Sequence, residues 1–424
     1  MTSETECFVY IVPPDQTQFV TAARFRITAT RYGGQVGEFV YGRRYLERTD
    51  AVELDPVELK LGRSNYETAR MGGFFGAIRD AMPDFWGRRV IQRNAGSTTL
   101  GQFDYLFHGP DDRAGALGFG RHVEPPAPRR HFSRTLDLET LQTIADAIIS
   151  EDADGIAAAT DARQVQQLLL EGTSMGGARP KAVIEDDDAL WIAKFSSPHD
   201  RWNQPRVEHA ILNLARTCGI DAADSKLTTV GRTDVLLVRR FDRDKAEHGY
   251  RRHRMASALT LLRSDDDPTV REAWSYLLLA DEIRRTSASP KADLRELYAR
   301  MCFNALVSNN DDHPRNHAVL AKDKGWRLSP AYDLTPTPSI AKDSRELAMV
   351  CGTQGRIARK DNLLSASGRF LLTSEEATQI LEGLVTKVRQ EWDAALRRAG
   401  VSERDNASIR NALLYEGFFY SGSE

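Results

Sequence analysis

The residues with the clearest chemical pattern lie in the last third of the chain. Asp311 is followed five positions later by Asn316, and Asp333 comes soon after. Phosphoryl transfer from ATP needs a carboxylate that orients the acceptor hydroxyl and oxygen ligands for one or two Mg²⁺ ions. The D-x-x-x-x-N spacing of Asp311 and Asn316 is that of a kinase catalytic loop. These three residues together predict a metal-phosphate site.

Alternatives remain for individual residues of this loop. Taken alone, the segment from Asn310 to Asn316 also fits an ordinary Asx-rich turn after a helix. The spacing selects Asp311 as the base, and Asp312 is the reserve candidate. His313 fits two interpretations equally, because a loop histidine can be satisfied locally or can contact a phosphate or the catalytic carboxylate.

A second pattern lies further toward the N-terminus, where a loop of small residues leads into a lysine-bearing segment. Gly176 and Gly177 would let backbone N–H groups approach phosphate oxygens closely, although a plain flexible turn fits this loop as well. Lys194 stands among apolar residues of a predicted strand, where its charge is costly unless it meets an anion. The alternative is a lysine that extends its ammonium group to solvent at the strand end.

Two further segments complete the order of parts found in a two-lobed kinase. Glu208 lies on the predicted helix that follows Lys194 and offers a carboxylate to hold that lysine. The segment from Val238 to Arg243 ends a buried strand where such a kinase would place the hinge that contacts adenine. It also fits an edge strand that leaves the core with surface arginines.

The hydrophobic pattern indicates the elements that must position these residues. A hairpin is predicted between Asn316 and Asp333, with strands at 318–321 and 326–329, and a second hairpin at 181–184 and 190–195. The first third predicts a small sheet, and Phe74, Phe75, Phe85 and Trp86 are expected in its core. Asp84 is a predicted helix cap. The remaining expected elements are a helix at 136–149, a helix at 205–215, a strand at 235–240, and helices at 270–287, 292–307, 374–398 and 402–415.

Several segments of the chain resemble the HipA family of toxin serine/threonine kinases. The segments are SMGGARPK, WIAKF, VRRFDR, NNDDHPRNH and AYDLTP, with FFGAIRDAMPDFWGRRVI and GALGF nearer the N-terminus. The resemblance extends over essentially the whole chain. It implies an α+β, protein-kinase-like two-lobed fold with a small β-rich N-terminal subdomain and a mainly helical C-terminal lobe. It also implies ATP and Mg²⁺ as cofactors and a small helix-turn-helix antitoxin of HipB type as partner, which would connect the protein to DNA only indirectly.

The resemblance also implies roles for individual residues. Asp311 would accept the proton, Asn316 and Asp333 would hold the metal, and Ser174 would be the loop serine that is autophosphorylated. The residues expected to surround the nucleotide are Gly176, Gly177, Ala178, Arg179, Pro180, Lys181, Lys194, Glu208, Arg239, Arg240, Phe241, His313, Asn316, Tyr332 and Asp333. Arg239 departs from the acidic residue that a family member can carry, which leaves the fine nucleotide contacts open.

Composition narrows the class of protein. The chain has 424 residues, 41% hydrophobic and 28% charged, with a formal net charge of -3. This composition is typical of a globular protein, and the charge provides no whole-chain field for nucleic acid or an anionic membrane. The four cysteines are widely spaced and no apolar run reaches the ~18 residues of a membrane helix. We therefore expect a cytoplasmic protein without a membrane partner.

The leading hypothesis is an ATP-dependent serine/threonine kinase toxin that phosphorylates a translation component, by analogy an aminoacyl-tRNA synthetase. The alternatives are a small-molecule kinase of the aminoglycoside phosphotransferase type and a catalytically idle corepressor that acts through its antitoxin. A proline-rich stretch at 124–135 suggests a boundary. The expected domains are 1–130 for the β-rich subdomain, 136–245 for the lobe with the phosphate loop, lysine and hinge, and 246–424 for the helical lobe.

Overall fold

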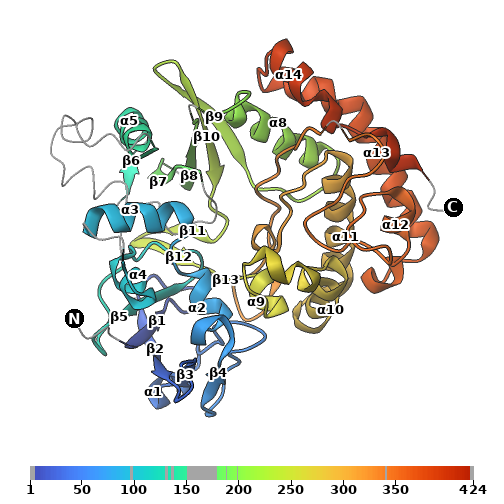
Figure 1. Cartoon of the computed structure of the whole chain (residues 1–424). Helices are drawn as coiled ribbons and strands as arrows, with labels where there is room; N and C mark the ends of the chain where they lie inside the picture. Colours follow the sequence, from blue (N-terminus) through green and yellow to red (C-terminus); the bar gives the residue numbers. More distant parts are fainter. Residues whose placement is uncertain are drawn as a thin grey trace. The chain divides into compact units, whose positions relative to one another are not determined.

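The computed structural model describes residues 5–95, 99–128, 132–134, 138–149, 179–187, 189–197, 199–339 and 341–420. The chain forms two compact units (Figure 1). The first unit contains residues 1–198, 229–256 and 320–325, and the second contains 199–228, 257–319 and 326–424. The predicted loop residues Ser174, Gly176, Gly177 and Ala178 lie outside the described residues. The three-domain division stays a prediction.

An antiparallel sheet begins the first unit, as the sequence predicts. Its strand order is β4-β3-β2-β1-β5. Buried and exposed residues alternate along β2, which gives the sheet one covered face. Phe74 and Phe75 pack into the core of this sheet, whereas Phe85 is 68% exposed, so its predicted burial is wrong. The elements are β1 (Glu6–Ile11), β2 (Val20–Ala29), β3 (Gln35–Tyr41), α1 (Arg43–Leu46), β4 (Tyr66–Thr68), α2 (Gly76–Asp80), α3 (Phe85–Ala95), α4 (Gln102–His108) and β5 (Leu117–Gly120).

A second sheet carries the predicted lysine strand. Its order is β6-β7-β8-β10-β9, and the hairpin of β7 with β8 confirms the sequence prediction. Trp86 of α3 and Leu141 of α5 share one apolar cluster with Ala193 and Phe195 of β8, so both helices cover this sheet. The elements are β6 (Ser133–Arg134), α5 (Leu138–Ile149), β7 (Lys181–Glu185), β8 (Leu190–Phe195), β9 (Ser225–Val230), β10 (Thr233–Arg239), β11 (Arg243–Ala246) and β12 (Gly249–Arg252).

A buried ion-pair network joins the end of β10 to the segment that precedes β5. Arg240 Nη1 donates to Asp112 Oδ2 at 2.6 Å, and its Nη2 donates to Asp242 Oδ2 at 2.9 Å. Arg243 pairs with the same two carboxylates at 3.4 and 2.9 Å. All four side chains are at most 1% exposed. Charges this deeply buried are stable only when each is paired, so the network connects the two sheets firmly.

The second unit is mainly helical. Figure 1 shows α10 and α11 beside each other, and α13 contacts both α11 and α8. Helix α11 has buried residues on every side, which makes it the central helix of the unit. The helices are α8 (Gln204–Thr217), α9 (Ala258–Leu262), α10 (Tyr276–Thr286), α11 (Pro290–Leu306), α12 (Lys360–Leu364), α13 (Ser374–Arg398) and α14 (Glu403–Ile409). None of the helices within the described ranges is long and apolar enough to cross a membrane.

Two predicted helix boundaries differ from the structure. The helix expected from Val270 begins at Tyr276, because 268–273 form a 3₁₀ turn and the Ser275 hydroxyl caps the N–H groups of Leu277 and Leu278. The helix expected at 402–415 ends at Ile409 and continues as a short 3₁₀ turn. The predicted hairpin at 318–329 is confirmed by β14 (Ala318–Ala321) and β15 (Arg327–Leu328), which pair in one sheet with β13 (Arg254–Ser257).

Replacement of one carboxylate tests the buried network. Asp112→Ala leaves the two buried cations Arg240 and Arg243 with Asp242 as their one shared carboxylate. One positive charge is then uncompensated in a region closed to water, so we expect a loss of about 3–5 kcal/mol in the free energy of unfolding. Glu38→Ala, which removes the partly exposed pair with Arg26 at 2.6 Å, is the matched control and should cost far less, because water screens an exposed pair. Urea denaturation of both variants measures the difference. Equal losses would contradict the structural role of the network.

Candidate active site

The predicted catalytic loop follows α11 and presents its two neighbouring carboxylates in opposite environments. Asp312 is 1% exposed. Its Oδ2 lies 2.6 Å from the Tyr276 hydroxyl, and its Oδ1 accepts the N–H of Ala348 at 2.7 Å. Asp311 has a side chain that is 73% exposed. The structure thus leaves Asp311 as the carboxylate of this pair that a substrate can reach.

Burial changes the protonation of the groups beneath the loop. It raises the pKa of Asp312 to about 7, and the hydrogen bonds from Tyr276 and Ala348 oppose this rise only in part. Burial also lowers the pKa of His317 to about 3, so this ring is neutral at pH 7. The Tyr276 hydroxyl lies 3.1 Å from His317 Nε2 and accepts an N–H from Asn304 at 3.0 Å. A connected polar network therefore supports the loop from below.

Asp311 is held in place through its backbone. The Asn316 side-chain amide donates to the Asp311 carbonyl at 2.7 Å, which closes the loop across the D-x-x-x-x-N spacing. Desolvation raises the pKa of Asp311, although its side chain is largely exposed. His313 lowers that pKa and the Asp333 carboxylate raises it. These two electrostatic effects place both groups near Asp311.

His313 satisfies both of the interpretations left open from the sequence. Its Nδ1 accepts the N–H of Arg315 at 3.3 Å and so caps the 3₁₀ turn of residues 314–316. Its Nε2 lies 3.7 Å from Asp311 Oδ1, close enough for an ion pair when the ring is protonated. The histidine therefore shapes the loop and contacts the exposed carboxylate.

Asp333 is brought to the loop by its neighbour. The Tyr332 hydroxyl donates to the Arg315 carbonyl at 2.8 Å, which fixes the chain after β15 against the turn that contains Asn316. Asp333 has a φ of 55°, a left-handed conformation that costs energy for a residue other than glycine. Such strain is common where a side chain must take a fixed direction at a functional site.

The oxygen atoms of this site fit a magnesium ion. The Asn316 amide uses its nitrogen toward Asp311, and its Oδ1 accepts no hydrogen bond from the part of the chain that the structure describes. Asp333 contributes a carboxylate. Amide and carboxylate oxygens are hard ligands of the kind that Mg²⁺ takes, usually one or two per site together with substrate phosphates. The described residues contain no cluster of three or more His, Cys, Asp or Glu suited to a metal.

The predicted phosphate-side residues lie in the first unit, apart from Glu208. Lys194 is half-buried in β8, opposite Lys181 of β7 and Leu236 of β10. Arg179 is half-buried, Pro180 is buried, and the Pro180 carbonyl accepts the N–H of Phe195 at 3.1 Å. Glu208 is a buried residue of α8, in the second unit.

Two of these predicted residues have partners that the sequence did not reveal. Lys181 is 2% exposed, and its Nζ donates to Asp84 Oδ2 at 2.6 Å. Asp84 also caps α3 through the N–H of Gly87, as predicted. Arg240 belongs to the buried network described above, so its guanidinium faces carboxylates of its own unit, whereas Arg239 is exposed and Phe241 half-buried. The guanidinium of Arg240 is therefore engaged, and a nucleotide could contact this residue only through its main chain.

Sequence analysis missed the residues that support the loop. The Tyr276 hydroxyl bonds Asp312 directly, and Asn304 and His317 reach Asp312 through that hydroxyl. None of the three has a role that a recognised motif predicts. Asn304 carried a weak signal, because it is a polar residue inside the strongly apolar end of α11.

The chain is similar to several known proteins. A family model described as "HipA-like C-terminal domain" matches residues 173–392. A protein of Sinorhizobium fredii named "Putative kinase Y4mE" is 28% identical over 353 residues, which cover 77% of this chain and 78% of that protein. The "Serine/threonine-protein kinase toxin HipA" of Shewanella oneidensis is 26% identical over 157 residues, or 34% of this chain and 36% of that one.

A solved structure extends the likeness to nearly the whole chain. It is a complex of HipA, HipB and operator DNA from Shewanella oneidensis MR-1, in which one chain matches with a TM-score of 0.68. The sequence identity is 16%, and the match covers 96% of this chain and 94% of that chain. The α+β, kinase-like fold expected from the sequence is thereby confirmed.

The raised pKa of Asp312 predicts a pH-dependent stability difference. The ordinary pKa of this carboxyl group is 3.8, and its pKa in the folded protein is about 7. Between these two pH values the folded protein keeps a proton that the unfolded chain releases. The wild type should therefore lose stability relative to Asp312→Asn as the pH rises, by up to about 1.4 kcal/mol per pH unit.

Urea denaturation of both proteins from pH 4.5 to 8 measures this difference. His317 gains stability with rising pH over part of the same range, but it titrates in both proteins, so the subtraction removes most of its contribution. A difference that does not change with pH would mean that Asp312 is ionised in the folded protein throughout.

Proposed function

This chain belongs to the HipA family, and on that premise we propose that it is an ATP-dependent serine/threonine protein kinase that acts as the toxin of a toxin-antitoxin pair. The observation that carries the proposal is that Asp311 is exposed whereas its neighbour Asp312 is buried. The exposed Asp311 stands beside Asn316 and under the electrostatic influence of Asp333. This is the donor set that phosphoryl transfer requires.

In the proposed reaction the acceptor hydroxyl oxygen attacks the γ-phosphorus of ATP. The bond from phosphorus to the β–γ bridging oxygen breaks, ADP leaves, and the hydroxyl proton passes to Asp311. Asn316 Oδ1 and Asp333 would hold Mg²⁺, which neutralises charge on the phosphates. Lys194, Gly176 and Gly177 would face the phosphates, and the Arg239–Phe241 main chain would meet the adenine. Lys181 is instead held by Asp84.

The raised pKa of Asp311 suits its proposed role. A carboxylate with a pKa above its ordinary value holds a proton more readily, so it is a better acceptor for the hydroxyl proton. His313, 3.7 Å away, opposes that rise in the pKa of Asp311.

The proposed partner is a small helix-turn-helix antitoxin of HipB type, through which the protein would meet DNA. Support comes from family membership and from the solved relative, which is in complex with HipB and operator DNA. The proposed substrate is a component of translation such as an aminoacyl-tRNA synthetase, and it rests on family analogy alone. A cytoplasmic location follows from these proposed partners.

Incubation of the purified protein with cell lysate and labelled ATP tests the proposal. Transfer of label to a discrete protein band, with identification of that band by mass spectrometry, is the expected result. Label on small molecules alone would favour an aminoglycoside-type phosphotransferase, and no label on any acceptor would favour an idle corepressor.

Substitution at Asp311 separates catalysis from binding. Asp311→Asn should lower phosphoryl transfer by about 10²–10⁴-fold and leave ATP affinity nearly unchanged, since the proton acceptor is lost and the phosphate contacts remain. Asp333→Ala should instead weaken binding of Mg-ATP, because a metal ligand is removed.

Nucleotide titration and turnover assays on the same preparations compare these variants. Asp343→Asn, an exposed carboxylate outside the loop, is the control and should behave as wild type. Near wild-type turnover of Asp311→Asn would show that the proposed base is wrong.

Ser174 is the proposed site of autophosphorylation. A phosphate there adds about -1.5 to -2 charges at pH 7 beside the proposed phosphate loop, so it should repel ATP and inactivate the kinase. After incubation with Mg-ATP, mass spectrometry should find phosphate on Ser174 in the wild type and not in Asp311→Asn. The modified protein should bind ATP more weakly, and unchanged affinity would rule out this mechanism of inhibition.

A further inference from the structure

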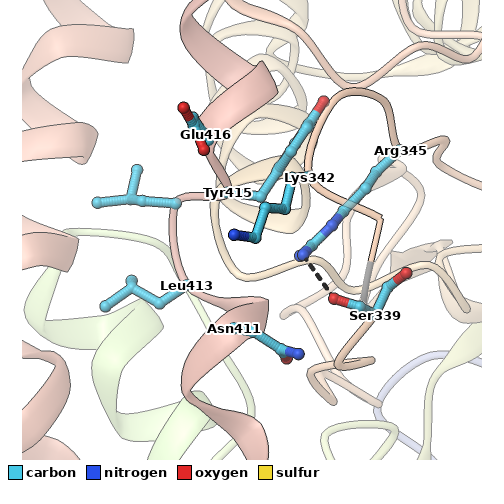
Figure 2. Close-up of a pocket in the computed structure, with 8 residues that line it drawn as sticks. Ser339, Lys342, Arg345, Asn411, Leu413, Tyr415 and Glu416 are labelled. Carbon is cyan, nitrogen blue, oxygen red and sulfur yellow. Dashed lines mark hydrogen bonds between the residues drawn. The ribbon is translucent and has the colours of Figure 1, made fainter.

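A pocket of about 400 Å³ lies within the second unit, lined by Ser339, Lys342, Arg345, Asn411 and the segment 413–416 (Figure 2). Its volume falls in the usual range for small-molecule sites. None of its residues belongs to the candidate active site. The side chains that matter for its chemistry are Ser339, Lys342, Arg345, Asn411, Leu413, Tyr415 and Glu416.

Arg345 is a buried cation without a carboxylate partner. It is 6% exposed, and it donates to three neutral oxygens: Ala341 O at 3.1 Å, Ser308 Oγ at 2.6 Å and Ser339 O at 3.0 Å. No ion pair of Arg345 with an Asp or Glu occurs anywhere in the described ranges. A guanidinium has five N–H donors, so two remain for a ligand. A charge this buried gains more than an exposed one from an anion that enters the pocket.

Lys342 supplies a second positive charge at the same place. Its backbone carbonyl accepts the N–H of Gly417 at 2.7 Å, which fixes its position on the wall of the pocket. The side chain is exposed, and its ammonium group has no partner within the structure as described. Figure 2 shows the ammonium of Lys342 and the guanidinium of Arg345 pointing into the same space, with Asn411 across from them.

Glu416 adds one carboxylate to the lining, against the two cations, and the remainder of the wall is apolar and firmly held. The Tyr415 ring lies under the Arg345 guanidinium at 4.7 Å, and its hydroxyl donates to Ala358 O at 2.8 Å. Leu414 has a φ of 44° and donates its N–H to Leu306 O at 2.9 Å. A leucine in this left-handed conformation costs energy, so the backbone around the pocket is fixed by its surroundings. The wall therefore offers a preformed apolar surface next to two cations.

We propose that this pocket binds an organic oxyanion, that is, a phosphate or carboxylate group carried on an apolar or aromatic body. The oxyanion would lie between Lys342 and Arg345, with the amide of Asn411 as a further donor. Arginine binds both kinds of oxyanion through its planar array of donors. The apolar body would pack on Leu413 and Tyr415. Neither the candidate active site nor the family's phosphoryl transfer accounts for this arrangement.

Calorimetric titration with phenyl phosphate, benzoate and inorganic phosphate tests the proposal on the full chain. We expect phenyl phosphate or benzoate to bind with a Kd of about 1 mM or below, and inorganic phosphate at least about tenfold more weakly, since it lacks the apolar body. Which of the two aromatic probes binds more tightly identifies the oxyanion as phosphate or carboxylate.

Substitution of the exposed lysine locates the binding. Lys342→Met should raise the Kd of the better probe by about tenfold to a hundredfold, because it removes a charge-assisted contact without disturbing the core. Lys291→Met, on α11 and outside the pocket lining, is the matched control and should leave the Kd unchanged. Binding should also persist in the presence of saturating ATP.

Three results would overturn the proposal. The first is the absence of binding by either aromatic probe at 10 mM, which is about tenfold above the expected Kd. The second is an equal effect of Lys342→Met and Lys291→Met on the Kd. The third is displacement of the probe by ATP. The last result would place the probe at the proposed nucleotide site. Each of these readouts is independent of phosphoryl transfer, so failure of the proposed kinase activity would leave this test interpretable.

Discussion

The hydrogen bond between Tyr276 and the buried carboxyl group of Asp312 is the contact on which the candidate site depends. It holds one of two adjacent carboxyl groups inside the unit, and the short loop leaves its neighbour facing outward. The N–H of Ala348 binds the other oxygen of Asp312, so three segments distant in sequence meet at one side chain. The position of Asp311 is thus set from beneath, by groups that make no contact with a substrate.

Local patterns were enough to predict the loop and the elements around it. The spacing of Asp311 and Asn316 indicated a closed loop, and an amide-to-carbonyl hydrogen bond closes it. Strand propensity and turn chemistry indicated one hairpin between Asn316 and Asp333 and another that carries Lys194, and both hairpins are present. Such features depend on neighbours within a few residues, which is the range over which sequence patterns are informative.

Contacts between distant segments could not be predicted in this way. Lys181 pairs with Asp84, 97 residues away, and Arg240 pairs with Asp112, 128 residues away. The family resemblance implies a place beside the nucleotide for both basic residues. Neither propensity nor periodicity carries information on which carboxylate a buried cation will meet. The predicted burial of Phe85 is wrong for a similar reason, because the helix period does not determine which face of a short helix packs against the core.

The division of the first unit among the segments 1–198, 229–256 and 320–325 has a consequence for synthesis on the ribosome. The N-terminal portion emerges with Asp112 and without Arg240 or Arg243, and the Asp323 carbonyl that binds Arg254 follows later still. A chain grows at about 5–20 residues per second, so the first unit waits seconds for its own missing parts. A chain that ends between residues 112 and 240 would carry Asp112 without the two arginines that neutralise it in the folded unit.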